Sequence, residues 1–161
     1  MNPEPDQLVR VLFVCLGNIC RSPMAEAVFR SLVQEAGLAN QIDIASAGTG
    51  GWHAGESPHR GTLAVLRAHQ IEVGRKRAQQ LTRSDMQAYD YIVAMDAENV
   101  GDIHALFGRA VPRLLEFAPP DSQARLDVPD PYYDGNFEEV YDLVLAGCRG
   151  LLAHIRAQEG L

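Results

Sequence analysis

The chain has 161 residues, of which 47% are hydrophobic, a length that suits one globular domain with its own core. Its net charge is −7, and residues 81–161 hold 14 acidic against 6 basic groups, a balance that disfavours nucleic acid and anionic membranes as partners. The first 22 residues lack the pattern of a signal peptide, and no run approaches the roughly 18 apolar residues of a membrane span. Three cysteines are too few for a disulfide framework and lack zinc-site spacing. We therefore expect one domain over residues 1–161, located in the cytoplasm.

The first structured element is expected at residues 8–14, a nearly continuous apolar run that predicts a strand buried on both faces. The polar residues 1–7, with two prolines, are expected to form a flexible leader. Ser22 and Pro23 offer an N-cap hydroxyl and a proline at the first helical position, so a helix is predicted to begin there and to end at Gly37.

Later segments repeat this alternation of strand and helix. Short apolar runs predict strands at 42–47, 91–95 and 111–115. Helical spacing or capping residues predict helices at 58–69, 97–107 and 137–157, with a short helix near residue 84, and Asp96 is the expected N-cap of the helix at 97–107. Such alternation indicates an α/β fold with a parallel sheet. The proline-rich segment 118–136 is longer than an ordinary connection, which favours a functional loop.

The segment that joins the first strand to the first helix, residues 15–21, has the features of a phosphate-binding loop. Gly17 and Asn18 tolerate the left-handed dihedrals of a nest of backbone N–H groups, and Arg21 offers a bidentate fork to phosphate oxygens. The same positive surroundings favour the thiolate form of Cys15, the form that attacks. Ser22 is placed to donate a hydrogen bond to that sulfur. A buried cysteine beside a surface arginine is the simpler alternative, but the surrounding residues make it the weaker one.

Four segments occur in order along the chain: CLGNICRSP, SAGTGGWH, AMDAEN and DPYYDGNFEEVY. Together they resemble the low-molecular-weight protein tyrosine phosphatases, over roughly residues 8–157. The resemblance implies that Cys15 is the nucleophile, Arg21 the ligand of the phosphate and transition state, and Asp130 the general acid. It also implies a single-domain, flavodoxin- or Rossmann-like fold with a four-stranded parallel sheet, strand order 2-1-3-4, and helices on both faces.

The remaining site residues are expected around the same loop. Loop placement favours Leu16, Trp52, Tyr132 and Tyr133 as walls of a slot deep enough for an aryl phosphate, although aromatic residues are more often part of a core. The resemblance implies a hydrogen-bonded pair, Asn18 with Ser46, that supports the loop. The candidate substrate- and phosphate-binding residues are therefore Leu16, Gly17, Asn18, Ile19, Cys20, Ser22, Trp52, Tyr132 and Tyr133.

Two departures from the family pattern concern the support of the loop. Arg75 stands where the family often carries a histidine, and His59 stands where an acidic residue is usual. Cys20 has two interpretations: an apolar filler, or a partner for reversible disulfide formation with Cys15 that would protect the nucleophile from further oxidation.

The expected function is metal-independent hydrolysis of phosphotyrosine proteins or small aryl phosphates, with no cofactor, by a monomer or weak dimer. An arsenate reductase on this fold would need further cysteines, and none lies between Cys20 and Cys148. Arginine phosphatases of the family tend to carry threonine where Ile19 sits. A phosphate-binding module without catalysis would have no use for Cys15 or Asp130.

Overall fold

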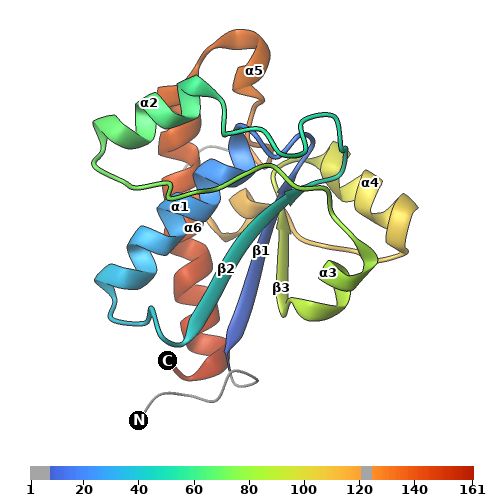
Figure 1. Cartoon of the computed structure of the whole chain (residues 1–161). Coiled ribbons are helices and arrows are strands. Elements are labelled where there is room, and N and C mark those ends of the chain that lie inside the picture. The colour runs from blue at the N-terminus through green and yellow to red at the C-terminus, as the bar shows by residue number, and fades with distance from the viewer. Residues whose placement is uncertain (1–7, 121–124) are drawn as a thin grey trace.

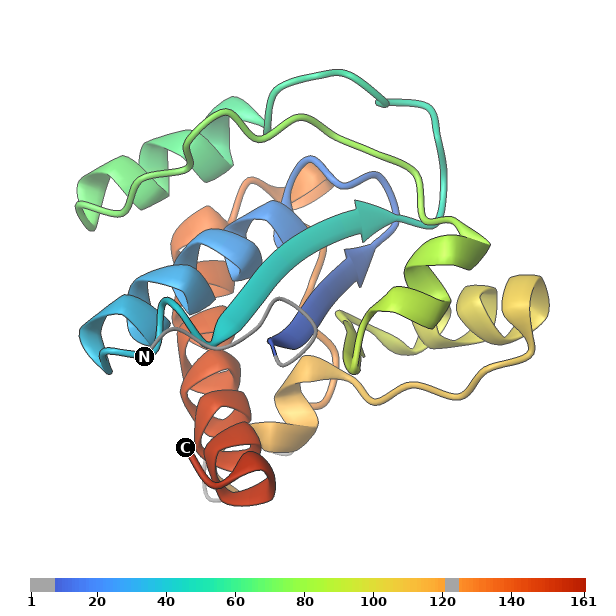
Figure 2. The same ribbon diagram turned by 60° about the horizontal axis from the view of Figure 1, so that its bottom comes forward.

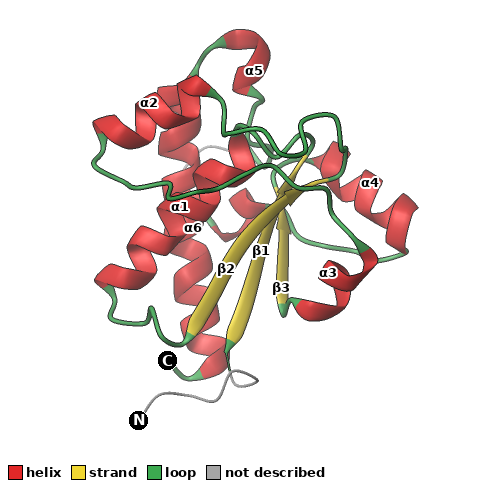
Figure 3. Ribbon diagram, in the orientation of Figure 1, coloured by secondary structure: helices red, strands yellow, loops and turns green. Residues whose placement is uncertain are grey.

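The computed structural model describes residues 8–120 and 125–161, so the predicted leader at 1–7 lies outside the described part. Three parallel strands, β1 (Val9–Cys15), β2 (Ile42–Gly48) and β3 (Tyr91–Ala94), form a sheet in the order β2-β1-β3 (Figures 1 and 3). The central strand β1 pairs with β2 from Val9 to Cys15 and with β3 from Val11 to Val14. The predicted parallel α/β fold is therefore confirmed.

Helices cover both faces of this sheet. The helices of the described residues are α1 (Arg21–Glu35), α2 (Arg60–Ala68), α3 (Arg83–Ala88), α4 (Ala97–Phe107), the 3-10 helix η2 (Leu114–Phe117), α5 (Pro131–Asp134) and α6 (Phe137–Glu159). Helices α1 and α6 lie on one side of the strands, and α3 and α4 on the other (Figures 1 and 2).

Alternating side chains of β1 supply the core on each side. Val11 and Phe13 belong to the cluster that includes residues of α1 and α6, and Phe13 meets the ring of Phe29 edge-on at a centroid distance of 5.4 Å. Leu12 and Val14 belong to the cluster on the side of α3 and α4. All four β1 side chains are fully buried, as expected for the central strand of a parallel sheet.

The prediction of a fourth strand at 111–115 is wrong. One isolated bridge joins Ala94 to Arg113, and the N–H of Ala94 donates to the carbonyl of Pro112 at 2.9 Å. Pro112 has no N–H to continue a ladder, and the chain then turns into η2, which buries Leu114 and Leu115.

The predicted cap of the first helix is also wrong. Helix α1 begins at Arg21, its N-cap Cys20 makes no side-chain cap bond, and Pro23 occupies the third helical position. The hydroxyl of Ser22 is used elsewhere, as described below. The helix ends as predicted, with Gly37 in the left-handed region at φ 73°.

The carboxyl ends of the strands lie at the end of the molecule that also carries α5 (Figure 1). Helix α5 interrupts the predicted loop 118–136, of which residues 121–124 are outside the described part. Segments from opposite ends of the sequence therefore meet at this edge of the sheet, where ligands bind in open α/β folds.

Candidate active site

A cavity of about 290 Å³ opens at the carboxyl end of β1. It is lined by Cys15, Leu16, Gly17, Ile19, Cys20, Arg21, Trp52, His53, Asp130, Tyr132 and Tyr133. The structure thus brings Cys15 and Arg21 together with Asp130, more than a hundred residues later in the chain. Three predicted site residues, Asn18, Ser22 and Ser46, do not line the cavity.

The guanidinium of Arg21 is buried and held by three oxygen partners. Its Nη1 donates to Asp96 Oδ2 at 2.5 Å and to the carbonyl of Val128 at 3.0 Å, and its Nη2 lies 3.7 Å from Asp130 Oδ2. Burial by itself would lower the pKa of Arg21, but Cys15 and the two carboxylates raise it above the ordinary value. The site therefore has a fixed positive charge. Sequence reasoning identified Asp96 only as the cap of α4, a role that its bond from the N–H of Asn99 confirms.

Asp130 lines the cavity and directly precedes α5. Its Oδ1 accepts the N–H of Tyr132 at 3.0 Å, and Pro131 occupies the first helical position. The side chain is 31% exposed, so its carboxyl can exchange protons with solvent while Oδ2 faces Arg21.

A chain of hydrogen bonds supports the Cys15 loop (residues 15–21) from behind. Ser22 Oγ lies 3.0 Å from Cys15 Sγ and accepts from Asn18 Nδ2 at 2.8 Å. Asn18 Nδ2 also donates to Ser46 Oγ at 2.9 Å, which confirms the expected pair, and Ser46 Oγ donates to Glu26 Oε1 at 2.6 Å. The side chains of Asn18 and Ser22, which are among the candidate substrate- and phosphate-binding residues, lie in this supporting network.

The network ends on an ion pair that sequence reasoning missed. Lys76 Nζ donates to the carbonyl of Ser46 at 2.8 Å and lies 3.7 Å from Glu26 Oε1, and both charged side chains are 9% exposed. Burial lowers the pKa of Lys76, and Glu26 offsets part of this effect. Lys76, and not the neighbouring Arg75, therefore stands next to the loop network. The sequence did contain one sign that Lys76 has a special role: it is the only lysine, beside thirteen arginines.

At two glycines, Gly17 and Gly48, neighbouring atoms approach the backbone too closely for a side chain to fit without a shift. Of the two residues expected to be left-handed, only Asn18 is, at φ 57°. Gly17 is closely packed instead, because an added Cβ would lie 3.0 Å from His53 Cδ2 and the His53 ring would have to move. Gly48, at the end of β2, passes closer still: its Cβ would lie 2.7 Å from the carbonyl oxygen of Leu16.

The loop is anchored through its carbonyl groups. The carbonyl of Leu16 accepts from the N–H of Gly50, that of Ile19 from the N–H of His59 at 2.7 Å, and that of Cys20 from the hydroxyl of Thr62. Within residues 8–120 and 125–161, the N–H groups of residues 16–20 donate to no protein oxygen. Those N–H groups remain available to an anion.

His59, one of the two departures from the family pattern, has a structural use. Its Nδ1 accepts the N–H of Gly61 and so caps α2, and its ring stacks on Phe137 at 5.1 Å. The ring also meets Tyr132 edge-on, so α2 contacts both the Cys15 loop and the segment that carries Asp130.

The aromatic residues expected to form a slot are not part of the core. Trp52 and Tyr133 are 73% and 81% exposed, and Tyr132 is 49% exposed with its ring centroid 5.1 Å from that of Tyr133. His53, which sequence reasoning passed over, lines the cavity beside them, and its Nδ1 lies 2.8 Å from Glu56 Oε2.

Cys20 is buried, and burial together with the neighbouring charge of Cys15 raises its pKa to about 12. The Cys20 thiol therefore stays protonated at neutral pH. All three cysteines are free thiols in this structure, and a disulfide between Cys15 and Cys20 stays a prediction.

Two kinds of feature are absent from residues 8–120 and 125–161. No helix there is long and apolar enough to cross a membrane. Likewise, no group of three or more His, Cys, Asp or Glu side chains in those ranges is arranged to hold a metal ion.

Comparison with known proteins agrees with this geometry. The family model for low molecular weight phosphotyrosine protein phosphatase matches residues 10–160. Low molecular weight protein-tyrosine-phosphatase YfkJ of Bacillus subtilis is 49% identical over 158 residues, covering 96% of this chain and 100% of the relative, and PtpA of Staphylococcus aureus is 43% identical over 148 residues, covering 92% and 94%. The crystal structure of YfkJ superimposes with a TM-score of 0.89 at 48% identity, covering 94% of this chain and 96% of that one. The chain belongs to the low molecular weight phosphotyrosine protein phosphatase family.

Proposed function

We propose that this chain hydrolyses phosphotyrosine in proteins, and small aryl phosphate monoesters, through a phosphocysteine intermediate. The observation that carries the proposal is the shared cavity, in which the Cys15 thiol, the Arg21 guanidinium and the Asp130 carboxyl meet beneath exposed aromatic walls. The family and the names of the relatives support the same activity.

In the first step the Cys15 thiolate attacks phosphorus in line with the leaving phenolic oxygen. The S–P bond forms, the P–O bond to the phenol breaks, and protonated Asp130 gives its proton to the departing oxygen. Arg21 and the free N–H groups of residues 16–20 stabilise the charge that develops on the equatorial oxygens. Ser22, 3.0 Å from the sulfur, stabilises the thiolate before attack.

In the second step water replaces the phenol. The Asp130 carboxylate now takes a proton from this water, which attacks phosphorus and breaks the S–P bond. The sulfur leaves as a thiolate, and the hydroxyl of Ser22 stabilises it again. Inorganic phosphate is released and Asp130 is protonated once more, so the site returns to its starting state.

The walls of the cavity favour an aromatic leaving group. Trp52, Tyr132 and Tyr133 line the cavity with exposed aromatic side chains, and Ile19 adds an apolar side chain where arginine phosphatases tend to have threonine. Ring contacts of this kind stabilise a bound aryl group. Phosphotyrosine is therefore the better substrate class than phosphoarginine.

A cytoplasmic location and a monomeric or weakly dimeric state belong to the same proposal. Three free thiols, among them the Cys15 nucleophile, suit a reducing compartment, and the charge balance disfavours nucleic acid and membranes as partners.

The test is steady-state hydrolysis in the presence of EDTA. We expect the purified chain to hydrolyse p-nitrophenyl phosphate and a phosphotyrosine peptide, and Cys15→Ser to lose turnover while it still binds the peptide. Asp130→Ala should lower kcat/KM by about 10²–10⁴-fold for phenyl phosphate, whose leaving group needs the acid, and much less for p-nitrophenyl phosphate. Turnover by Cys15→Ser, or a preference for phosphoarginine or arsenate, would refute the proposal.

A further inference from the structure

The acid segment (residues 127–130) is fixed to the rest of the chain through the backbone of Val128. The N–H of Val128 donates to the carbonyl of Met95 at 2.9 Å, and its carbonyl accepts from Arg21 Nη1 at 3.0 Å. Only one residue, Pro129, separates this anchor from Asp130. A shift of Val128 therefore moves the carboxyl of Asp130.

Asp127 makes a second attachment one residue earlier. Its Oδ1 accepts the N–H of Ala97 at 2.9 Å and lies 3.1 Å from Arg113 Nη1. Ala97 is the first residue of α4, so its N–H has no partner within the helix, and the positive end of the helix dipole favours a carboxylate there. The ion pair with Arg113 is half-exposed and weak by comparison, because solvent screens it.

These contacts converge on three consecutive residues at the end of β3. Met95 binds the backbone of the acid segment, Asp96 binds Arg21, and Ala97 binds Asp127. Residues 95–97 therefore position both Arg21 and the segment that carries Asp130.

We infer that Asp127 is a positioning residue for the general acid: its bond to Ala97 holds Asp130 within reach of the leaving-group oxygen. This inference rests on the proposed function. Asp127 touches neither the Cys15 loop nor the cavity lining, so its loss affects the proton transfer and leaves attack by sulfur intact.

The test compares kcat/KM for phenyl phosphate and p-nitrophenyl phosphate, since kcat/KM includes the steps up to the phosphocysteine. We expect Asp127→Ala to lower kcat/KM by about tenfold for phenyl phosphate, part of the contribution of a positioned acid, and by less than about twofold for p-nitrophenyl phosphate. Asp127→Asn keeps an oxygen acceptor for Ala97 and should restore most of the loss. In an Asp130→Ala background, Asp127→Ala should cause no further loss.

The matched control is Asp85→Ala. Asp85 also accepts a backbone N–H at a helix N-terminus, that of Thr82 before α3, and it has no contact with the acid segment. Its kcat/KM values should stay within about twofold of the wild type, and thermal unfolding of each variant checks the fold. Equal losses for both substrates, an additional loss in the Asp130→Ala background, or no loss at all would overturn the inference. If Asp130→Ala itself shows no dependence on the leaving group, the assigned acid of the proposed function is wrong instead.

Discussion

The side chains of Glu26 and Lys76 form a buried ion pair next to the Cys15 loop. Each is 9% exposed, and each also bonds to Ser46, Glu26 through the hydroxyl and Lys76 through the carbonyl. Burying two charges is costly, and removing one partner leaves the other without full compensation. The pair therefore fixes Ser46, and through Ser46 the position of Asn18 in the loop.

Replacing Lys76 by methionine should lower the free energy of unfolding by about 2 kcal/mol, because among the described residues Arg30 is then the remaining cationic partner of the buried Glu26 carboxylate. Urea denaturation measures this loss. Arg30→Met is the matched control: Arg30 binds the same carboxylate at 2.7 Å but is 36% exposed, so its loss should be less than about 1 kcal/mol. Equal losses in the two variants would contradict this account of the buried pair.

At the scale of elements, the end of β2 and the Cys15 loop are packed against each other without a side chain between them. Gly48 makes this approach possible, and its backbone also bonds to Gln79 and Leu81 on the far side. Any side chain at residue 48 must push the Cys15 loop or the strand out of place.

Gly48→Ala should lower kcat/KM by about 10²-fold, because displacement of catalytic groups by about 1 Å costs that much. The loss should be similar for p-nitrophenyl phosphate and phenyl phosphate, since the nucleophile itself is displaced. Gly101→Ala in α4, where an added Cβ meets nothing within 4 Å, is the matched control and should stabilise the fold by about 0.5–1 kcal/mol without affecting activity. A fully active Gly48→Ala would refute the close-packing argument.

The elements that sequence patterns predicted correctly are those whose signal is local. Periodicity was enough for β1 and α6, and Asp96 was recognisable as a cap of α4. The failures came where hydrogen bonds compete: Pro112 ends a strand pairing after one bridge, and the Ser22 hydroxyl serves Asn18 and Cys15 and caps no helix.

At the scale of the whole molecule, the candidate site depends on contacts between distant parts of the chain. Family resemblance was sufficient to predict Cys15, Arg21 and Asp130 as site residues, and the structure brings the three into one cavity. The resemblance did not reveal Lys76 or Asp127, because the contacts of these side chains span 30 residues each and no local pattern encodes such a distance. The core residues are easier to predict than the site contacts, because their burial follows from the periodicity of apolar residues alone.

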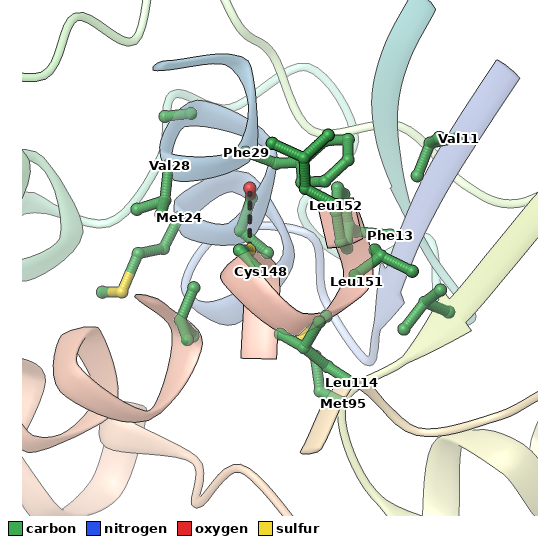
Figure 4. Packing of buried hydrophobic residues seen from close by; sticks show 14 of the residues in the cluster. Val11, Phe13, Met24, Val28, Phe29, Met95, Leu114, Cys148, Leu151 and Leu152 are labelled. Atoms are coloured by element: carbon green, nitrogen blue, oxygen red, sulfur yellow. Dashed lines mark hydrogen bonds between the residues drawn. The ribbon is translucent and has the colours of Figure 1, made fainter. Parts of the chain in front are cut away.

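A titratable thiol lies where α6 packs on α1, and we expect it to make the fold less stable at alkaline pH. Cys148 is fully buried, and its thiol contacts the carbonyl of Ala25 at 3.8 Å (Figure 4). Burial raises the pKa of Cys148, so the folded state keeps the proton where an unfolded thiol, with a pKa of about 8.5, releases it. Unfolding is therefore favoured as pH rises above that value.

Between pH 7 and pH 10 this group should lower the free energy of unfolding by about 2 kcal/mol. The measurement is the difference in unfolding free energy between the wild type and Cys148→Ala at both pH values, because other groups contribute equally to the two proteins. The advantage of the wild type should shrink by that amount at pH 10. A difference that stays constant with pH would show that the buried thiol does not contribute.

The central claim is that the Cys15 sulfur carries the phosphoryl group during turnover. The most direct measurement is mass spectrometry of protein quenched in acid while it hydrolyses p-nitrophenyl phosphate, followed by peptide mapping. The account predicts one phosphoryl group on the peptide that contains Cys15, and none on Cys15→Ser. Turnover with no phosphoryl group on Cys15, or with one on a different residue, would contradict it.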